Sequence, residues 1–177
     1  MEFIGQWDVS ILLWIQEILR SDTMTVFWKA ITWLGDGGKI WILSAVILLL
    51  RKKTRQTGFL VLLALLICNI ATNDIFKEIF KRPRPFRSID TLVPLIQKPG
   101  SYSFPSGHTS SSFCAAFVYF KKLPGKCAVL ALLLAAMIAF SRIYLGVHYP
   151  SDILGGVILA YIVSIVVCHI EFKEQLS

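Results

Sequence analysis

The chain is organised around residues 77–152, and the centre of this stretch reads Pro105-Ser106-Gly107-His108. Upstream of the centre lies the pair Arg84-Pro85, and downstream lies the pair Ser141-Arg142. Two of the three histidines fall within the stretch, and long apolar runs separate its polar groups. Basic and hydroxyl side chains between apolar runs indicate a phosphate site that is built into a membrane protein.

The composition excludes an ordinary soluble domain. The chain has 177 residues, the size of one domain, and 55% of them are hydrophobic. The mean hydropathy is +0.66. Only 16% of the residues are charged, yet the net charge is +7, so lysine and arginine must gather in the loops between apolar runs. We therefore predict an all-α fold, a polytopic membrane bundle of five to six transmembrane helices.

The four cysteines show no spacing typical of a metal site or a disulfide framework. They lie in apolar runs, and we interpret all of them as small core residues: Cys68, Cys114, Cys127 and Cys168. The first 20 residues lack a basic start and a small-residue cleavage site, so we expect no signal peptide.

Residues 1–36 are predicted to form an amphipathic segment in the membrane interface. Apolar residues recur at helical spacing from Trp7 to Leu19, with four polar residues on the other side: Asp8, Gln16, Glu17 and Arg20. A second piece carries Trp28 and Trp33, two aromatic residues suited to anchoring at the interface.

The apolar run 40–50 is too short to cross a membrane, which takes about 20 residues. The first crossing must either include residues before the cluster Gly35–Gly38 or tilt little and use Lys39 as a snorkelling end. The second crossing carries polar groups near its far end that we expect to face the bundle interior: Asn69, Asn73, Asp74 and Lys77.

Two basic turns set the predicted topology. The segment Arg51–Arg55 and the lysines at 121, 122 and 126 connect apolar runs, so both are expected in the cytoplasm. Five prolines between residues 81 and 106 exclude a continuous helix and predict an external loop. The helices expected after the first crossing cover residues 58–80, 108–120, 127–144 and 151–170.

Five crossings place the amino terminus outside and the carboxyl terminus inside. A sixth crossing within residues 8–35 stays open, and it would reverse the amino terminus only. The membrane domain is predicted to cover residues 37–171, and residues 172–177 form a cytoplasmic tail. This parity brings six polar residues to one membrane face: Lys77, Arg84, His108, Arg142, His148 and Asp152.

The candidate phosphate ligands are cations and a helix start. The helix start at Pro105-Ser106-Gly107-His108 offers unpaired backbone N–H donors of the kind that bind phosphate. Gly107 allows a close approach, and Ser106 adds a hydroxyl donor. Lys77, Arg84 and Arg142 supply three cations for the phosphoryl oxygens. The alternatives are that Pro105-Ser106-Gly107-His108 only caps a helix, and that basic residues snorkel to lipid headgroups, which we accept for Lys81, Arg87 and Lys98.

Two histidines are candidates for chemistry. Asp152 follows His148 by four residues, so its carboxylate can hold one imidazole nitrogen and leave the other to attack phosphorus. His108 is then the general acid for the leaving oxygen. We assign a structural role to His169.

These motifs resemble those of the type 2 phosphatidic acid phosphatase (PAP2) superfamily. The matching patterns lie at Lys77 to Pro85, at Pro105 to His108 and at Ser141 to Asp152, and no motif position is broken. The resemblance implies that His148 forms a phosphohistidine, that Asp152 orients it and that His108 is the acid. It also implies phosphate binding by five residues without a metal or cofactor: Lys77, Arg84, Ser106, Gly107 and Arg142.

The resemblance leaves the substrate open. Small bacterial members with an outward-facing site resemble undecaprenyl diphosphate phosphatases of cell-wall synthesis, which is our first expectation. A phosphatidylglycerophosphate or phosphatidic acid phosphatase comes second, and a non-catalytic lipid-phosphate binder or transporter is the alternative of another class. We expect membrane lipids as partners and no nucleic acid, and an integral protein of the bacterial plasma membrane whose site faces outside.

Overall fold

The computed structural model describes residues 2–123 and 125–169; the predicted tail, residues 172–177, lies outside them. Within the described residues, nine α-helices and no strands are found: α1 (Glu2–Trp14), α2 (Asp22–Gly35), α3 (Lys39–Leu49), α4 (Arg55–Ile70), α5 (Lys77–Phe80), α6 (Pro85–Ser88), α7 (Gly107–Lys122), α8 (Gly125–Tyr144) and α9 (Pro150–Cys168). The predicted all-α membrane bundle is confirmed.

The bundle is built around α7, which packs against α4, α8 and α9. Small residues fill its buried faces, among them Ser112, Ala115 and Ala116, so neighbouring backbones can approach closely. In the described part of the chain, four stretches are long and apolar enough to cross a membrane: Asp22–Leu49, Lys52–Ser88, Gly125–Tyr144 and Pro150–Cys168. With 16 residues, α7 is shorter than these and runs among them.

The first candidate crossing includes residues on both sides of a glycine kink. Gly37 and Gly38 have φ angles of +60° and +71°, which glycine adopts without strain, and they separate α2 from α3. The whole stretch Asp22–Leu49 has 28 residues. Of the two alternatives for this crossing, the structure therefore favours the one that uses residues before the glycine cluster.

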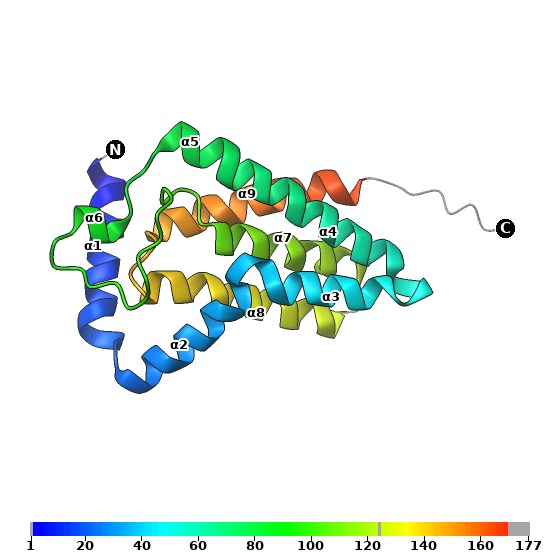
Figure 1. The fold of residues 1–177 in the computed structure, drawn as a ribbon, viewed down its shortest axis with the longest axis horizontal. Helices are drawn as coiled ribbons and strands as arrows, with labels where there is room; N and C mark the ends of the chain where they lie inside the picture. The colour runs from blue at the N-terminus through cyan, green and yellow to red at the C-terminus, as the bar shows by residue number, and fades with distance from the viewer. Residues whose placement is uncertain (1, 124, 170–177) are drawn as a thin grey trace.

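Helix α1 lies across one end of the bundle, and α2 leads from it toward α3 (Figure 1). Leu12 is buried against the bundle, whereas Trp7 and Trp14 are more than half exposed. Of the two candidate interfacial anchors, Trp33 is exposed, but Trp28 packs against the Phe140 ring at a centroid distance of 4.9 Å.

Helices α3 and α4 touch at one end and diverge toward the other (Figure 1). They meet at Gly58, where a Cβ atom would lie 2.6 Å from the carbonyl oxygen of Ala45 and 2.9 Å from the backbone nitrogen of Leu49. Any side chain here would force the two backbones apart. The divergence beyond this contact leaves room for a cavity near the far end of α4.

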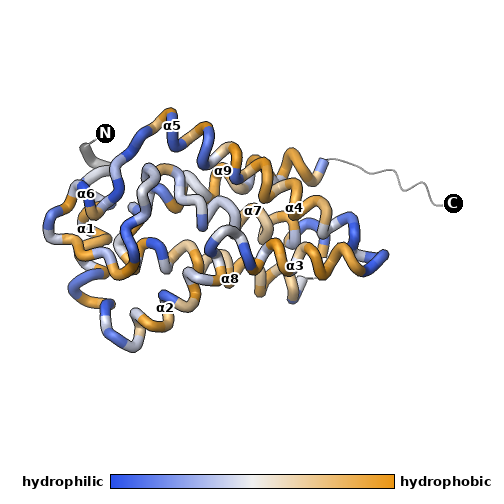
Figure 2. Tube along the Cα trace, viewed as in Figure 1, coloured by the Kyte–Doolittle hydropathy of each residue, from blue (hydrophilic) through white to orange (hydrophobic). Residues whose placement is uncertain are grey.

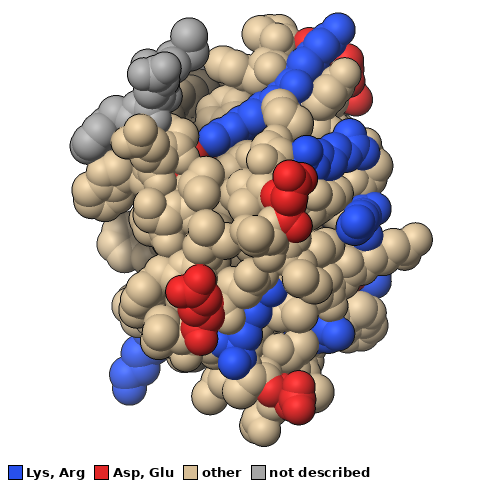
Figure 3. All heavy atoms as spheres, turned by 90° about the vertical axis from the view of Figure 1, so that its left-hand side faces the viewer, with Lys and Arg blue, Asp and Glu red and all other residues tan. Residues whose placement is uncertain are grey.

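The two ends of the bundle differ in charge and loop length. Arg51–Arg55 and the turn before α8 lie at one end, and the long connection between α5 and α7 lies at the other (Figures 1 and 2). Figure 3 looks onto the second end and shows Lys and Arg side chains among a few Asp and Glu side chains. The loops that carry the predicted site residues meet there.

Two expectations about single residues are wrong. Cys127 is exposed at the start of α8, so it is not a core residue, while Cys68 and Cys114 are buried and all four thiols are free. Asp74 is exposed and does not face the bundle interior. Asn69, Asn73 and Lys77 follow a spacing of four residues and line a cavity, whereas Asp74 is not among the lining residues.

Candidate active site

A cavity of about 960 Å³ opens at the loop-rich end of the bundle. Six of the eight predicted site residues line it: Lys77, Arg84, Gly107, His108, Arg142 and His148. Ser106 and Asp152 are fully buried behind this lining. Residues more than 70 positions apart in the sequence, such as Lys77 and His148, thus line the same cavity.

Lys77 reaches the cavity through a widened turn of helix. Residues Ala71–Phe76 form a π-helical turn, in which the backbone N–H of Lys77 donates to the carbonyl of Thr72. Such turns are frequent at functional sites because they redirect side chains. The Lys77 ammonium donates to Asn73 Oδ1 at 2.8 Å and to Ser101 Oγ at 3.3 Å, and the side chain is almost fully buried.

Arg84 connects the long loop to the histidine predicted to be the nucleophile. Its Nε donates to the carbonyl of Ser101 at 2.7 Å, and its Nη1 donates to the carbonyl of Val147 at 2.9 Å. The same Nη1 lies 3.1 Å from His148 Nε2. Because a guanidinium has no acceptor, Nε2 must accept this hydrogen bond and therefore carries no proton.

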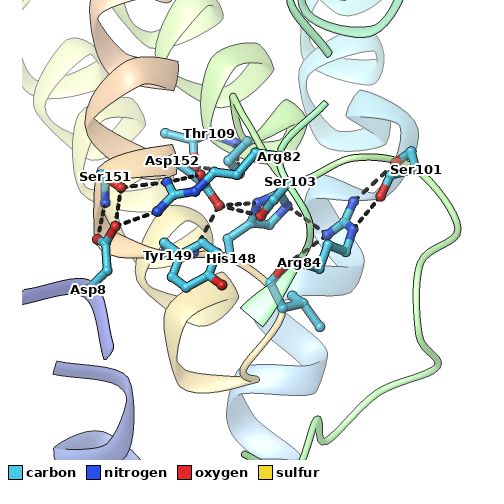
Figure 4. A network of polar contacts seen from close by, with 12 residues as sticks. Asp8, Arg82, Arg84, Ser101, Ser103, Thr109, His148, Tyr149, Ser151 and Asp152 are labelled. Carbon is cyan, nitrogen blue, oxygen red and sulfur yellow. Dashed lines mark hydrogen bonds and ion pairs between the residues drawn. The ribbon is translucent and has the colours of Figure 1, made fainter. Parts of the chain in front are cut away.

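The other nitrogen of His148 faces a carboxylate. With Nε2 unprotonated, the neutral ring carries its proton on Nδ1, which points at Asp152 Oδ2 from 3.3 Å. Asp152 Oδ2 also accepts from the backbone N–H of Tyr149 at 2.9 Å and from Ser103 Oγ at 2.5 Å. The carboxylate is thus fixed, and it fixes the tautomer that nucleophilic attack requires (Figure 4).

His148 stays uncharged at neutral pH. Burial, the largest cause, lowers the pKa of His148 from its usual 6.5 to about 3; nearby Arg84 and Arg142 act in the same direction and Asp152 acts against them. Nε2 therefore stays unprotonated near neutral pH, where its lone pair accepts the hydrogen bond from Arg84.

Arg142 lines the cavity and has one buried donor without a partner among the described residues. Its Nη1 donates to Thr32 Oγ1 at 2.5 Å, but its Nε is buried without a hydrogen-bond partner. The Thr72 hydroxyl is also buried without a partner, and both residues line the cavity. An unpaired buried polar group costs about 1–3 kcal/mol, so an anion that satisfied both groups would gain affinity.

His108 has a carboxylate partner that the sequence did not reveal. The glycine kink between α2 and α3 places Asp36 Oδ1 at 2.8 Å from His108 Nε2. A carboxylate can only accept, so His108 Nε2 carries the proton of this hydrogen bond. The only signal in the sequence was an acidic residue among the glycines at 35–38.

Ser106 acts as a helix cap. Its Oγ accepts from the Thr109 backbone N–H at 3.4 Å and from the Thr109 hydroxyl at 3.0 Å. The alternative of a capping role is thus realised, and phosphate binding by Ser106 stays a prediction. Next to it, Gly107 lines the cavity, where a Cβ atom would meet nothing closer than Thr72 Cγ2 at 3.8 Å.

Sequence reasoning also missed Arg82 and Asp8. Arg82 joins Asp152 at 2.7 Å and Asp8 at 2.6 Å, and Asp8 is buried rather than placed on an outer polar face. The three basic residues assigned to lipid headgroups are exposed: Lys81, Arg87 and Lys98. An acidic residue within an apolar amino-terminal pattern was the available signal for Asp8.

The sequence profile of the PAP2 superfamily matches residues 57–176. The undecaprenyl-diphosphatase of Sulfolobus acidocaldarius is 30% identical over 132 residues, covering 75% of this chain and 64% of its own length. A decaprenylphosphoryl-5-phosphoribose phosphatase of Mycobacterium tuberculosis is 29% identical over 171 residues, covering 95% and 93%. The chain thus spans just under two thirds of the first relative.

Among solved structures, the PAP2 type phosphatidylglycerolphosphate phosphatase of Bacillus subtilis superposes with a TM-score of 0.76. It shares 29% sequence identity with this chain, and the alignment covers 95% of this chain and 86% of that one.

Proposed function

Because the chain belongs to the PAP2 superfamily, we propose that it is a membrane lipid phosphatase and that its substrate is a polyprenyl diphosphate. One observation carries the proposal. The cavity joins a cationic end, at Lys77, Arg84 and Arg142, to an apolar wall between α3 and α4. This combination suits a molecule with a phosphorylated head and a hydrocarbon tail.

The apolar wall contains Ile42, Leu62, Leu65 and Leu66. The side chains of Ile42 and Leu66 are exposed, as suits residues that contact a hydrocarbon tail. A lipid can therefore bring its headgroup to the cations while its tail stays in the bilayer.

The proposed mechanism uses His148 Nε2 as the nucleophile. The lone pair attacks phosphorus, the bond from phosphorus to the leaving oxygen breaks, and Nδ1–H of the new phosphohistidine is held by Asp152. Once the lone pair of His148 Nε2 bonds to phosphorus, it can no longer accept from Arg84, and Arg84 donates to a phosphoryl oxygen instead. The cations stabilise the charge spread over the equatorial oxygens.

His108 acts on the other side of the phosphorus. In this proposal His108 begins as an imidazolium: its Nε2–H donates to Asp36, and its Nδ1–H gives its proton to the departing oxygen, which leaves the ring neutral. Water then attacks the phosphohistidine, His108 takes the proton of that water, and inorganic phosphate leaves with His148 restored.

A diphosphate is preferred because donors continue beyond the three cations. Lys29, Asn69 and Gln97 line the same cavity and could donate to a second phosphate group. The first relative in the comparison is an undecaprenyl-diphosphatase, which supports this choice. A phosphatidylglycerophosphate phosphatase is the second candidate, supported by the Bacillus subtilis structure.

Phosphate release by the purified protein in detergent tests the substrate. We expect turnover of a polyprenyl diphosphate in buffer that contains EDTA, because cations replace a metal, and we expect its kcat/KM to exceed that of phosphatidylglycerophosphate and phosphatidate about tenfold or more. The His148→Ala variant, purified in the same way, serves as the control for phosphate released by contaminating enzymes. A higher kcat/KM with phosphatidylglycerophosphate would favour the second candidate, and binding of every lipid without release would sink the phosphatase proposal.

We also propose that the chain lies in a plasma membrane with the cavity on the outer side, since the two basic turns favour the cytoplasm. Cysteine labelling tests this orientation in a variant whose exposed Cys127 is first changed to alanine. An impermeant maleimide should label Lys98→Cys in intact cells and should label Lys53→Cys only after permeabilisation. The reverse pattern would place the cavity on the inner leaflet.

A further inference from the structure

A buried ion cluster joins the amino-terminal helix to the nucleophile's carboxylate. We propose that Asp8 is a positioning residue for His148, acting through Arg82 and Asp152. The inference rests on the proposed function, because it assigns a role in the same reaction. It concerns a helix that contributes no residue to the lining of the cavity.

The contacts form an unbroken series (Figure 4). Asp8 Oδ2 accepts from Arg82 Nη2 at 2.6 Å, and Arg82 Nη1 donates to Asp152 Oδ1 at 2.7 Å. Asp152 then uses its other oxygen, Oδ2, for the ring of His148. Two residues, Arg82 and Asp152, thus connect Asp8 of α1 to the ring of His148, and each of the three links is a charge-assisted hydrogen bond.

Asp8 is satisfied as a buried anion must be. Only 2% of its surface is exposed, and Ser151 supplies two further donors, the backbone N–H to Oδ1 at 2.9 Å and the hydroxyl to Oδ2 at 2.5 Å. Ser151 lies in the first turn of α9, where the unpaired N–H groups favour a negative charge. The geometry therefore fixes the carboxylate in one place relative to α9.

The fork of Arg82 is divided between two carboxylates. One terminal nitrogen serves Asp8 and the other serves Asp152, while the guanidinium lies 4.0 Å from the centroid of the Tyr149 ring. An arginine that faces a single carboxylate prefers to bind both of its oxygens. Asp8 therefore holds one nitrogen of Arg82 away from Asp152 Oδ2, so that Arg82 does not compete with His148 for this oxygen.

The charges of Arg82, Asp8 and Asp152 also support a positioning role for Asp8. Arg82 and Asp8 neutralise each other, so the negative charge of Asp152 remains to stabilise the ring as it becomes cationic during attack. Without the charge of Asp8, Arg82 compensates Asp152 instead. Loss of Asp8 should therefore slow the chemical step and leave the phosphate cradle intact.

The variant Asp8→Asn tests this division of roles, with Glu17→Gln as the matched control. Glu17 lies on the same amino-terminal segment, but it is exposed. We expect kcat of Asp8→Asn to fall about 10²-fold, the size of effect that misplacement of a reacting group by about 1 Å produces. KM and the inhibition constant of inorganic phosphate should change less than about twofold, and Glu17→Gln should match wild type.

A double-mutant cycle identifies Arg82 as the intermediary. The loss in Arg82→Gln should equal or exceed that in Asp8→Asn, and the double variant should lose no more than Arg82→Gln alone. Arg82→Lys tests the same link without a change in α1, since an ammonium lacks the fork that reaches two carboxylates. Losses that multiply in the double variant would overturn the proposal.

The tautomer of His148 gives a readout that does not depend on turnover. The chain has only three histidines, so ¹⁵N resonances can be assigned with His148→Ala. We expect a single Nδ1-protonated ring in wild type and in Glu17→Gln, and a mixture of tautomers in Asp8→Asn. An unchanged tautomer together with an unchanged kcat in Asp8→Asn would overturn the role of Asp8. Wild-type protein with the expected tautomer but no phosphate release would instead overturn the proposed function.

Discussion

Replacement of His148 by alanine is expected to abolish phosphate release from every substrate, lipid or soluble. No other described group combines an unprotonated nitrogen, a fixed tautomer and a place among the three cations, so no phosphoenzyme can form without it. Loss of a nucleophile that acts together with its partners costs about 10⁴- to 10⁶-fold in kcat. Phosphate release from a polyprenyl diphosphate and from p-nitrophenyl phosphate measures this loss.

His169→Ala is the matched control for this prediction. His169 is exposed at the end of α9, and its Nδ1 lies 2.8 Å from the carbonyl oxygen of Ile165 in the same helix. Its replacement should leave kcat unchanged. Activity of His148→Ala above about one per cent of wild type would be incompatible with a covalent role for His148.

His108→Ala is expected to fail in a way that depends on the leaving group. Removal of a general acid typically costs about 10² to 10⁴ in rate, because the departing oxygen must then leave as an anion. A lipid phosphate group is a poor leaving group compared with p-nitrophenolate, which departs without a proton. The loss in kcat/KM should therefore be large for the lipid substrate and much smaller for p-nitrophenyl phosphate.

The ratio of the loss in kcat/KM with the lipid substrate to the loss with p-nitrophenyl phosphate shows whether a residue takes part in protonating the leaving group. Asp36→Asn should show the same dependence on the leaving group with a smaller loss, because Asp36 touches only the remote nitrogen of His108. If His108→Ala loses the same factor with both substrates, His108 does not protonate the leaving group, and it would have to bind or position phosphate instead.

The sequence predicted the charged part of the cavity lining, because polar residues within apolar runs must face the interior of a membrane bundle. Lys77, Arg142 and Asp152 each lie near the end of a predicted crossing, so counting the crossings was enough to bring them to one face. The glycine in Pro105-Ser106-Gly107-His108 and the basic loop after Lys77 then indicated an anion. Local spacing also predicted the contact of His148 with Asp152, which lies one helical turn away.

Contacts between segments that are distant in the sequence could not be predicted from helical spacing or from the count of crossings. Asp36 meets His108 only because two glycines with positive φ turn the chain between α2 and α3. Asp8 meets Arg82 because α1 lies across the end of the bundle, a packing that an amphipathic pattern alone does not specify. The prediction that Asp74 faces the interior was wrong because Asp74 is not spaced by four residues from Asn69, as Asn73 and Lys77 are.

The central claim is that phosphate passes through a covalent bond to His148. A rapidly quenched reaction with a radiolabelled terminal phosphate tests it most directly, followed by digestion and identification of the labelled peptide. We expect an acid-labile, alkali-stable label on His148 that is absent from His148→Ala and present in Asp8→Asn at a slower rate of formation. A label on Ser106, or turnover of wild-type protein with no labelled protein at any quench time, would contradict the account.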